Sequence, residues 1–368
     1  MPKQFASVLI DTYNHERFIE KAIVSVLEQD FPASEREVIV VDDGSTDGTQ
    51  EIVRKFEPRV RLLRKENGGQ ASAFNAGIPE CRGEIIAFLD GDDWWMREKL
   101  RRVAEVMVRE SSVGMVGHGF IETYNNGDQR VIAEDQPKRL RLDSVSSADI
   151  FRCNRGYFGT SRLALRAGIA RQILPVPEAL IFEADEYVFT LGAALSESFI
   201  LNAPLTYYRI HGGNLFYCAG ANPTGERKKQ QILAALAESL RHTLYSLEVP
   251  KDVAACVLEL SDAEAAQSRL RLDGGSPWET FQTETTIYRI QHRNEPWRNR
   301  AFRTVTMLPA LLLPARWFYT GRQWLGEQKW YKRTRKSLLP FPPVGVTEAR
   351  EDSEIHAPAR EILDGEKS

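Results

Sequence analysis

Short apolar runs alternate with amphipathic stretches through the first third of the chain, and this alternation restricts the fold more than any other feature. Five runs have the length and composition of buried strands, at residues 7–10, 38–41, 60–63, 85–89 and 114–117. The stretches between them have helical periodicity, at residues 17–28, 49–56, 70–76 and 97–109. The pattern predicts an α/β fold, a mostly parallel sheet with helices on both faces that binds its ligands beyond the carboxyl ends of the strands.

The composition excludes several classes of protein. The 368 residues include 48 Lys and Arg against 51 Asp and Glu, so we expect no nucleic-acid partner, which would require a basic excess. No apolar run reaches the roughly 18 residues that cross a bilayer, and no export signal precedes the first strand. The four cysteines are widely spaced without a CxxC pattern, which argues against a zinc site. We therefore expect a cytoplasmic protein with a packed core.

Polar loops follow four of the predicted strands and should meet at one edge of the sheet. They comprise residues 11–14, 42–47, 67–70 and 90–94. Turn chemistry explains such loops in part, because Asp, Asn, Gly and Ser favour turns for backbone reasons. The last loop fits that explanation least, because Asp90, Asp92 and Asp93 repel one another unless a cation compensates them. It predicts a divalent metal site with oxygen ligands, and a solvated acidic turn is the alternative.

The metal would also hold a phosphate-bearing ligand. Mg²⁺ is usually bound by one or two carboxylates together with substrate phosphates. The chain has no GxxxxGK[ST] motif, and no GxGxxG motif stands at the first strand-to-helix turn. The phosphates should therefore be held chiefly by the metal.

The order and spacing of these motifs resemble the N-terminal half of family 2 glycosyltransferases. The matching segments are residues 11–14, 41–47, 67–69, 74–77 and 83–93, and the resemblance covers roughly residues 5–215. It implies a GT-A fold, which is a Rossmann-like mostly parallel sheet flanked by helices. It also implies a nucleotide-diphosphate sugar donor, Mn²⁺ or Mg²⁺ as cofactor, and inversion at the anomeric carbon.

The resemblance assigns a donor site to the loops. Thr12 and Tyr13 would line the base pocket, and Asp42 or Asp43 would bind the nucleobase or ribose. The whole expected nucleotide-sugar site comprises Thr12, Tyr13, Asn14, Asp42, Asp43, Asn75, Asp90 and Arg209. For Asn75, a cap at the end of a helix before Gly77 is the alternative.

The same resemblance assigns the metal ligands. Asp92 would contact the metal directly, Asp90 would bind ribose or a metal-bound water, and Asp93 is the second carboxylate. Arg209 would meet the leaving diphosphate, and His211 would complete the metal shell or contact the phosphates. A His at such a position can also be simply hydrogen-bonded.

The expected catalytic base is one of three acids, Asp185, Glu186 and Glu183. An inverting transferase needs a carboxylate beside the acceptor hydroxyl to remove its proton. Family members often carry adjacent Glu and Asp here, whereas Ala184 separates Glu183 from Asp185. We expect Asp185 to be the base, and acids that simply favour a helix start are the alternative. Residues 156–161 lie where the family places a loop on the acceptor side.

The second half of the chain is rich in helix formers. We expect a catalytic domain at residues 1–220, a helical C-terminal appendage at 221–346 and a disordered tail at 347–368. Residues 302–336 combine Trp, Leu and Tyr with Arg and Lys, which is typical of a helix at a membrane interface. We expect them to attach the protein to the cytoplasmic face of the cell membrane. A core helix followed by a solvated basic face is the alternative.

The leading hypothesis is transfer of a sugar, with a UDP-sugar as the expected donor, to a glycan or lipid-linked acceptor in cell-surface polysaccharide synthesis. A sugar-phosphate nucleotidyltransferase is an alternative, but it would need a Gly-rich loop after the first strand, where residues 11–14 have none. A scaffold that binds nucleotide-sugars or glycans without catalysis is a second alternative.

Overall fold

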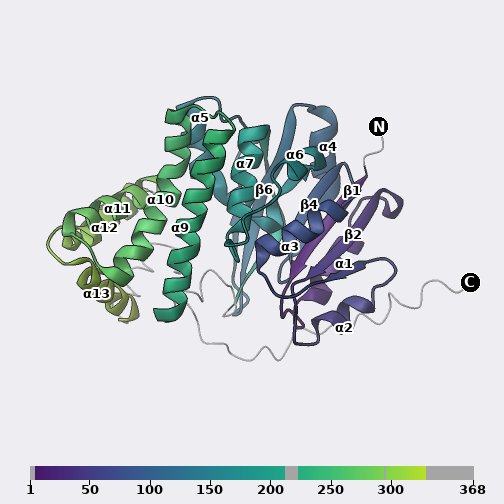
Figure 1. Cartoon of the computed structure of the whole chain (residues 1–368), viewed down its shortest axis with the longest axis horizontal. Coiled ribbons are helices and arrows are strands. Elements are labelled where there is room, and N and C mark those ends of the chain that lie inside the picture. Colours follow the sequence, from purple (N-terminus) through teal and green to yellow (C-terminus); the bar gives the residue numbers. More distant parts are fainter. Residues whose placement is uncertain (1–4, 212–222, 294–295, 329–368) are drawn as a thin grey trace, which may run out of the picture.

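The computed structural model describes residues 5–211, 223–293 and 296–328. Its centre is a ten-stranded sheet in the order β3-β2-β1-β4-β9-β6-β10-β5. Four parallel strands form one half of the sheet (Figure 1), namely β1 (Ala6–Thr12), β2 (Arg36–Asp42), β3 (Arg61–Arg64) and β4 (Ile85–Asp90). All four strands overlap the apolar runs expected from the sequence.

Alternate residues of these strands point to two separate cores. On one face Leu9 and Ile39 pack with α3 (Gln70–Gly77). On the other face Val8 and Val40 pack with the other helices of this half, which are α1 (Ile19–Leu27), α2 (Thr49–Arg54) and α4 (Lys99–Arg109). The strands are continuous apolar runs because both faces are covered. The expected helices on both faces are confirmed.

The other half of the sheet contains both parallel and antiparallel strand pairs. The strand β6 (Val113–Tyr124) is parallel to β10 (Glu197–Ile210), and β9 (Ala164–Arg166) lies antiparallel between β4 and β6. Three short strands complete the sheet: β5 (Trp94–Trp95), β7 (Gln129–Ile132) and β8 (Lys138–Leu140). The expected strand at residues 114–117 is only the beginning of β6.

The C-terminal helices share a core with the sheet. After α5 (Val145–Asn154), α6 (Ala167–Gln172) and α7 (Ala184–Leu195), the chain forms α9 (Pro223–Ser246) beside α7 and α10 (Lys251–Asp273) on the other side of α9 (Figure 1). One stripe of α9 is apolar at every fourth residue, at Ile232, Leu236, Leu240 and Leu244. This stripe and the start of α10 belong to the same buried cluster as Leu9 and Phe74. Removing these helices would expose the core of the catalytic half. The expected boundary at residues 220–221 falls outside the described residues.

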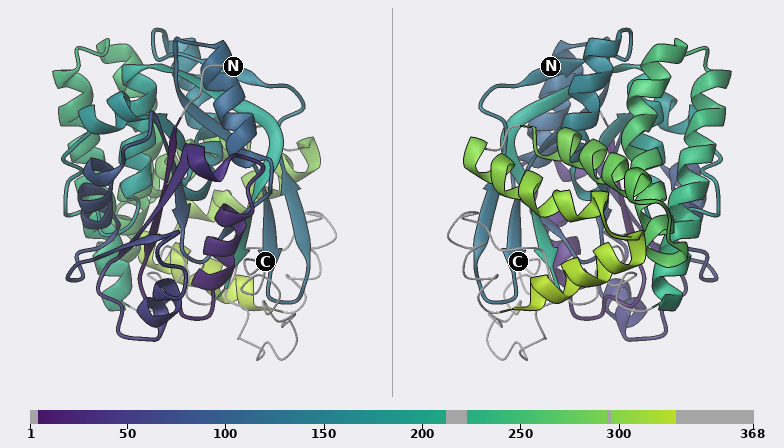
Figure 2. Two further views of the ribbon diagram at one scale, coloured as in Figure 1. Left: turned by 90° about the vertical axis from the view of Figure 1, so that its right-hand side faces the viewer. Right: turned by 90° about the vertical axis from the view of Figure 1, so that its left-hand side faces the viewer.

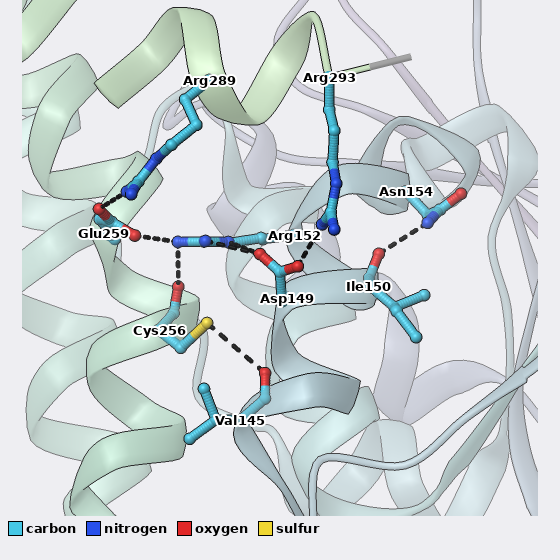
Figure 3. Close-up of polar contacts among 9 residues, drawn as sticks. All are labelled: Val145, Asp149, Ile150, Arg152, Asn154, Cys256, Glu259, Arg289 and Arg293. Atoms are coloured by element: carbon cyan, nitrogen blue, oxygen red, sulfur yellow. Dashed lines mark hydrogen bonds and ion pairs between the residues drawn. The ribbon is translucent and has the colours of Figure 1, made fainter. Parts of the chain in front are cut away.

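Ion pairs join α5 to the helical region. Arg152 donates to the Asp149 carboxylate (2.6 Å), to the backbone oxygen of Cys256 (3.3 Å) and to Glu259 on α10 (Figure 3). Arg289 on α11 (Pro277–Gln291) also binds Glu259, and Arg293 binds Asp149. Each acid therefore has two cationic partners, one of them on the opposite side of the interface.

The last helices lie at the end of the molecule farthest from α2 (Figures 1 and 2). They are α12 (Trp297–Met307) and α13 (Ala315–Glu327), joined by a short 3₁₀ turn at Leu308–Leu311. Phe318 and Tyr319 of α13 are buried against Leu270 of α10. None of the helices within the described ranges is long and apolar enough to cross a membrane.

We predict that Arg152→Leu lowers the free energy of unfolding by about 2–3 kcal/mol, because it leaves partly buried carboxylates without a central cation. The matched control is Arg241→Leu, which removes a more exposed pair with Asp262 and should cost under about 1 kcal/mol. Urea denaturation measures both. Equal unfolding midpoints for the two variants would contradict the role of Arg152.

Candidate active site

The register of the sheet places two acids side by side at its carboxyl edge. Asp11 at the end of β1 pairs with Asp90 at the end of β4, and the N–H of Gly91 donates to the backbone oxygen of Asp11 (2.9 Å). A Cβ on Gly91 would lie 2.6 Å from Oγ1 of Thr12 and 2.8 Å from Nδ1 of His15. The close contact explains why glycine stands between Asp90 and Asp92.

Asp90, Asp92 and Asp93 converge as the sequence predicts. Each offers a carboxylate oxygen, and these oxygens lie within 4.8 Å of one another. Asp93 is only 1% exposed, and its Oδ2 has no hydrogen-bond partner in the described part of the chain; the same holds for Oδ1 of Asp11. Several acid oxygens are therefore buried together with few donors.

This crowding shifts the pKa values of the acids. Burial, and then the charge of Asp92, raises the pKa of Asp93 to about 7. Burial also raises the pKa values of Asp11 and Asp90 well above the ordinary value, with neighbouring carboxylates adding to the effect. The pKa of Asp92 is lowered: burial raises it, but the hydrogen bond to His211 and the nearby His15 outweigh burial.

The end of β10 and the residue after it contact the acid cluster. Nε2 of His211 lies 3.0 Å from Oδ2 of Asp92. The backbone N–H of Arg209 donates to Asp93 (2.8 Å), and its Nε donates to the backbone oxygen of Asp92 (2.9 Å). The guanidinium of Arg209 packs against the rings of Phe18 and Trp94, each 4.7 Å away. Arg209 and His211 thus lie at the acid cluster, as expected for groups that meet a diphosphate or a metal.

The donor groups fit a hard divalent cation. Carboxylate oxygens are the preferred ligands of Mg²⁺ and Mn²⁺, and a bound cation would compensate their repulsion. The orphaned oxygens of Asp93 and Asp11 are the observation that carries this fit. The acids Asp90, Asp92 and Asp93 would hold the ion, with His211 beside Asp92.

Of the three candidate bases, Asp185 is the one joined to Asp90 by the described hydrogen bonds of Thr160 and Ser161. Its Oδ2 accepts from the N–H of Thr160 (3.0 Å) and its Oδ1 from the N–H of Glu186 (2.9 Å). Its charge is among the causes that raise the pKa values of both Asp11 and Asp90. The carboxylate therefore faces the acid cluster although 95 residues separate it from Asp90 in the sequence.

The other two candidates face the helical region. Glu186 forms an ion pair with Arg155 (2.6 Å) and accepts from Ser261 on α10 (2.7 Å). Glu183 has a left-handed backbone conformation, with φ of 62°, immediately before α7. Burial, and then Asp185 and Glu186, raises the pKa of Glu183. Arg155 also binds Glu264, so Glu186 belongs to an ion-pair network between α7 and α10.

The expected nucleotide-binding loops are held by their own polar residues. Asp43 accepts from the N–H of Gly69 (2.7 Å) and of Gly68 (3.0 Å) and pairs with Lys65 (2.5 Å). Asn14 accepts from the N–H of Thr46 (2.8 Å) and so ties the first loop to the second. Asp43 and Asn14 thus have structural tasks in addition to any contact with a ligand.

The remaining expected donor residues differ in surroundings. Tyr13 is exposed, whereas Thr12 is buried and its hydroxyl lies 3.2 Å from Nδ1 of His15. Asp42 accepts from the N–H of Ser45 (2.6 Å), and its Oδ2 is buried without a partner in the described residues. Asn75 lies inside α3 and does not cap it; its amide donates to the backbone oxygen and accepts from the N–H of Val176, both at 2.8 Å.

The sequence analysis singled out the segments that hold Asp11, Gln70, Thr160 and Ser161 but gave none of these four residues a role in the site. Asp11 could have been found, because it ends a strand next to the one that ends in Asp90. Gln70 lies in a recognised loop but carries no charge. Thr160 and Ser161 come from a 3₁₀ turn at Thr160–Arg162, which has no periodic pattern.

The sheet flanked by helices on both faces is the architecture of the GT-A fold, and comparison with known proteins identifies the family. The family model described as "Glycosyl transferase family 2" matches residues 7–166. The uncharacterized glycosyltransferase alr2836 of Nostoc sp. is 33% identical over 232 residues, which are 61% of this chain and 70% of the relative. The chain therefore belongs to glycosyl transferase family 2 and is a glycosyltransferase.

Two other proteins are informative. The Staphylococcus aureus poly(ribitol-phosphate) β-N-acetylglucosaminyltransferase TarS is 39% identical over 102 residues, 27% of this chain and 18% of TarS. The structure of TarS residues 1–349 with UDP-GlcNAc matches with a TM-score of 0.50 and 20% identity, covering 77% of this chain and 88% of that one. The mannosyltransferase PcManGT of Pyrobaculum calidifontis, solved with GDP-Man and Mn²⁺, matches with a TM-score of 0.50 and 18% sequence identity. The match covers 84% of this chain and 86% of that one. Both structural matches support the fold. The family assignment favours a glycosyltransferase over the nucleotidyltransferase and the non-catalytic scaffold.

The raised acid pKa values predict how stability depends on pH. Without metal, the folded protein holds protons that the unfolded chain releases near pH 4, so the free energy of unfolding should fall as pH rises from about 4 to about 7, where Asp93 ionises. Mn²⁺ would bind the ionised acids, so it should stabilise the protein more at pH 8 than at pH 5. At pH 8 and 100 times its Kd it should raise the melting temperature by roughly 3–4 °C. Thermal unfolding with Mn²⁺ or chelator measures this. An equal Mn²⁺ effect at both pH values would contradict the site.

Proposed function

We propose that this glycosyltransferase moves a sugar from a nucleotide-diphosphate sugar to a hydroxyl group with inversion at the anomeric carbon. The observation that carries the proposal is the position of Asp185. Its carboxylate is held by Thr160 and lies beside the acids that would bind metal and donor. A base on one side and a diphosphate site on the other is the arrangement that a single displacement requires.

The side chains divide the reaction between them. Asp185 accepts the proton of the acceptor hydroxyl as its oxygen bonds to the anomeric carbon, and the bond from that carbon to the nucleoside diphosphate breaks. Arg209, held over Phe18 and Trp94, supplies positive charge beside the departing diphosphate. A divalent ion held by Asp90, Asp92 and Asp93 would supply Lewis-acid stabilisation of that charge.

The proposed donor is a UDP-sugar and the proposed metal is Mn²⁺ or Mg²⁺. TarS was solved with UDP-GlcNAc and PcManGT with GDP-Man and Mn²⁺, which supports nucleotide-sugars as the donor class. The proposed base-pocket residues are Thr12, Tyr13 and Asp42. We place the acceptor among glycans or lipid-linked acceptors of cell-surface polysaccharide synthesis; the name of the Bacillus subtilis relative TuaG, a putative teichuronic acid biosynthesis glycosyltransferase, supports this proposal.

A panel of UDP-, GDP- and dTDP-sugars with the purified protein tests this function. We expect slow release of nucleoside diphosphate with Mn²⁺ or Mg²⁺ and none with chelator. Asp92→Asn should lower turnover by at least about 100-fold because the direct metal ligand is lost, whereas Asp185→Asn should retain donor binding and lose transfer. Turnover in chelator equal to that with metal would refute the metal role. Full activity of Asp185→Asn would refute the base.

We also propose that α12 and α13 attach the protein to the cytoplasmic face of an anionic membrane. Large apolar side chains are exposed on these helices and on the segment that joins them, with Leu312 of that segment 83% exposed, Trp297 of α12 73% and Trp317 of α13 71%. Exposed apolar side chains also occur at Val305, Leu308, Leu311 and Trp324. Such a concentration of apolar side chains indicates a binding surface rather than ordinary solvent exposure.

Charge supports a lipid partner for this surface. Between residues 296 and 328 the chain has Arg at positions 298, 300, 303, 316 and 322 and one acid, Glu327. Trp with Arg on short helices suits the headgroup region of anionic bilayers. In Figure 1 α13 lies on the same lower side of the molecule as α2, which follows the carboxyl end of β2. A membrane there would lie on the side where the catalytic acids are. Residues 329–336, which complete the expected segment, lie outside the described residues.

Vesicle flotation tests the membrane proposal. The wild-type protein should float with vesicles that contain roughly 30% phosphatidylserine. With vesicles of pure phosphatidylcholine it should remain in the bottom fraction. Trp317→Ser combined with Trp324→Ser should lose most of the bound fraction, because both side chains are exposed and not needed in the core. Tyr245→Ser, an exposed aromatic on α9, is the matched control and should float like the wild type. Equal flotation of all three proteins would exclude this surface.

A further inference from the structure

A 3₁₀ turn connects the acid cluster to the candidate base. The hydroxyl of Ser161 accepts from the N–H of Asp90 (3.1 Å) and donates to its Oδ2 (3.3 Å). The preceding residue, Thr160, donates its N–H to Oδ2 of Asp185 (3.0 Å). Two neighbouring residues thus hold the carboxylates that belong to the two halves of the reaction.

The turn itself is firmly anchored. The backbone oxygen of Ser161 accepts from the indole N–H of Trp95 (3.0 Å), from Nζ of Lys99 (2.9 Å) and from the hydroxyl of Thr206 (2.7 Å). Lys99 is fully buried, and its Nζ lies 3.4 Å from the centroid of the Trp95 ring. Ser161 therefore has little freedom to move, and Thr160 is held by its neighbour.

Gln70 closes this connection into a ring. Its Nε2 donates to the hydroxyl of Thr160 (3.0 Å) and to Oδ1 of Asp90 (3.4 Å), and its Oε1 accepts from the N–H of Ala184 (3.0 Å), the first residue of α7. One neutral amide therefore contacts Asp90, the turn and the helix that carries Asp185. A Glu at this position would add a further charge to the cluster, and an apolar side chain would make none of these bonds.

The backbone fixes where this amide can reach. The N–H of Gln70 donates to the backbone oxygen of Ile181 (3.0 Å). Gly69 has φ of 83°, and a Cβ on it would lie 2.4 Å from the Cα of Ile181. The start of α3 thus packs directly on the segment that leads into α7. The side chain of Gln70 therefore joins two segments whose backbones are already in contact.

We propose that Gln70 is a positioning residue, which sets the separation between Asp90 on the donor side and Asp185 on the acceptor side. The inference rests on the proposed function, because it takes Asp185 as the base. An error of about 1 Å between reacting groups can cost about 100-fold in rate. Gln70 would act on the rate through Asp185, without contact with the reacting atoms.

A double-mutant cycle tests this role against a merely structural one. The measured quantity is the rate of hydrolysis of whichever nucleotide-sugar the wild-type protein turns over in the donor panel described above. The concentration of folded enzyme is determined from the number of UDP-binding sites. We expect Gln70→Leu to lower kcat at least about 30-fold and to change the donor KM less than about threefold. In the Asp185→Asn background the same substitution should lower kcat less than about threefold, because the group it positions is gone.

Gln29→Leu is the matched control. Gln29 is also buried and also makes side-chain bonds to backbone groups, with Ser25 and Met96 as acceptors and the N–H of Leu100 as donor. The Gln29→Leu substitution should lower the melting temperature. In both the wild-type and the Asp185→Asn background it should change kcat, normalised to the number of UDP-binding sites, by less than about threefold. If Gln70→Leu fails to fold, Thr160→Val replaces it; this change removes the hydroxyl partner and retains the N–H that binds Asp185.

The outcomes are distinct. Equal losses from Gln70→Leu, or from Thr160→Val in its place, in the wild-type and Asp185→Asn backgrounds would overturn the positioning role and leave the proposed function standing. A wild-type protein that turns over no nucleotide-sugar, or an Asp185→Asn variant with full activity, would instead refute the proposed function. A selective loss in the wild-type background supports Gln70.

Discussion

Repulsion among buried carboxylates is the constraint on which the site depends. Asp11, Asp90, Asp92 and Asp93 come from two strand ends and one loop, and Asp185 adds a fifth acid from α7. Burial makes their ionisation unfavourable, and hydrogen bonds compensate only some of the oxygens. Arg209 on β10 lies at the cluster and opposes this repulsion, and under the proposed function a divalent cation would compensate it further.

The scaffold resists this repulsion because it is fixed from several directions. Gly91 lets the acid loop approach Thr12, and the turn at Thr160 and Ser161 is anchored through Trp95, Lys99 and Thr206. On the far side, Arg155 and Arg152 bind α7 and α5 to the helices of the C-terminal half. The shared apolar core means that these helices support the position of α7 and, through it, the carboxylate of Asp185.

Much of the fold was predictable from the sequence because strands buried on both faces are continuous apolar runs. The position of the acid cluster was predictable for a related reason. The carboxyl ends of parallel strands meet at the same edge of a sheet, so Asp90 and its neighbours had to lie at that edge. The choice among Glu183, Asp185 and Glu186 was different. Neighbouring residues on a helix point about 100° apart, so only the packing of α7 against its neighbours decides that Glu186 faces Arg155 while Asp185 faces the acids. The contacts of Gln70 and Ser161 join distant segments through irregular turns, and no local pattern indicates them.

The pairing of Asp11 with Asp90 has a consequence for the tolerance of the sheet to change. Successive side chains of a strand lie on opposite faces, so a slip of β4 by one residue would set Leu89 or Gly91 opposite Asp11. The aliphatic cores on both sides of β1 and β4 oppose such a slip, because it would turn every buried side chain of β4 to the wrong face. Hydrophobic packing far from the chemistry thereby protects the spacing of the acids, and insertions within these strands should be eliminated by selection even where they leave each catalytic residue intact.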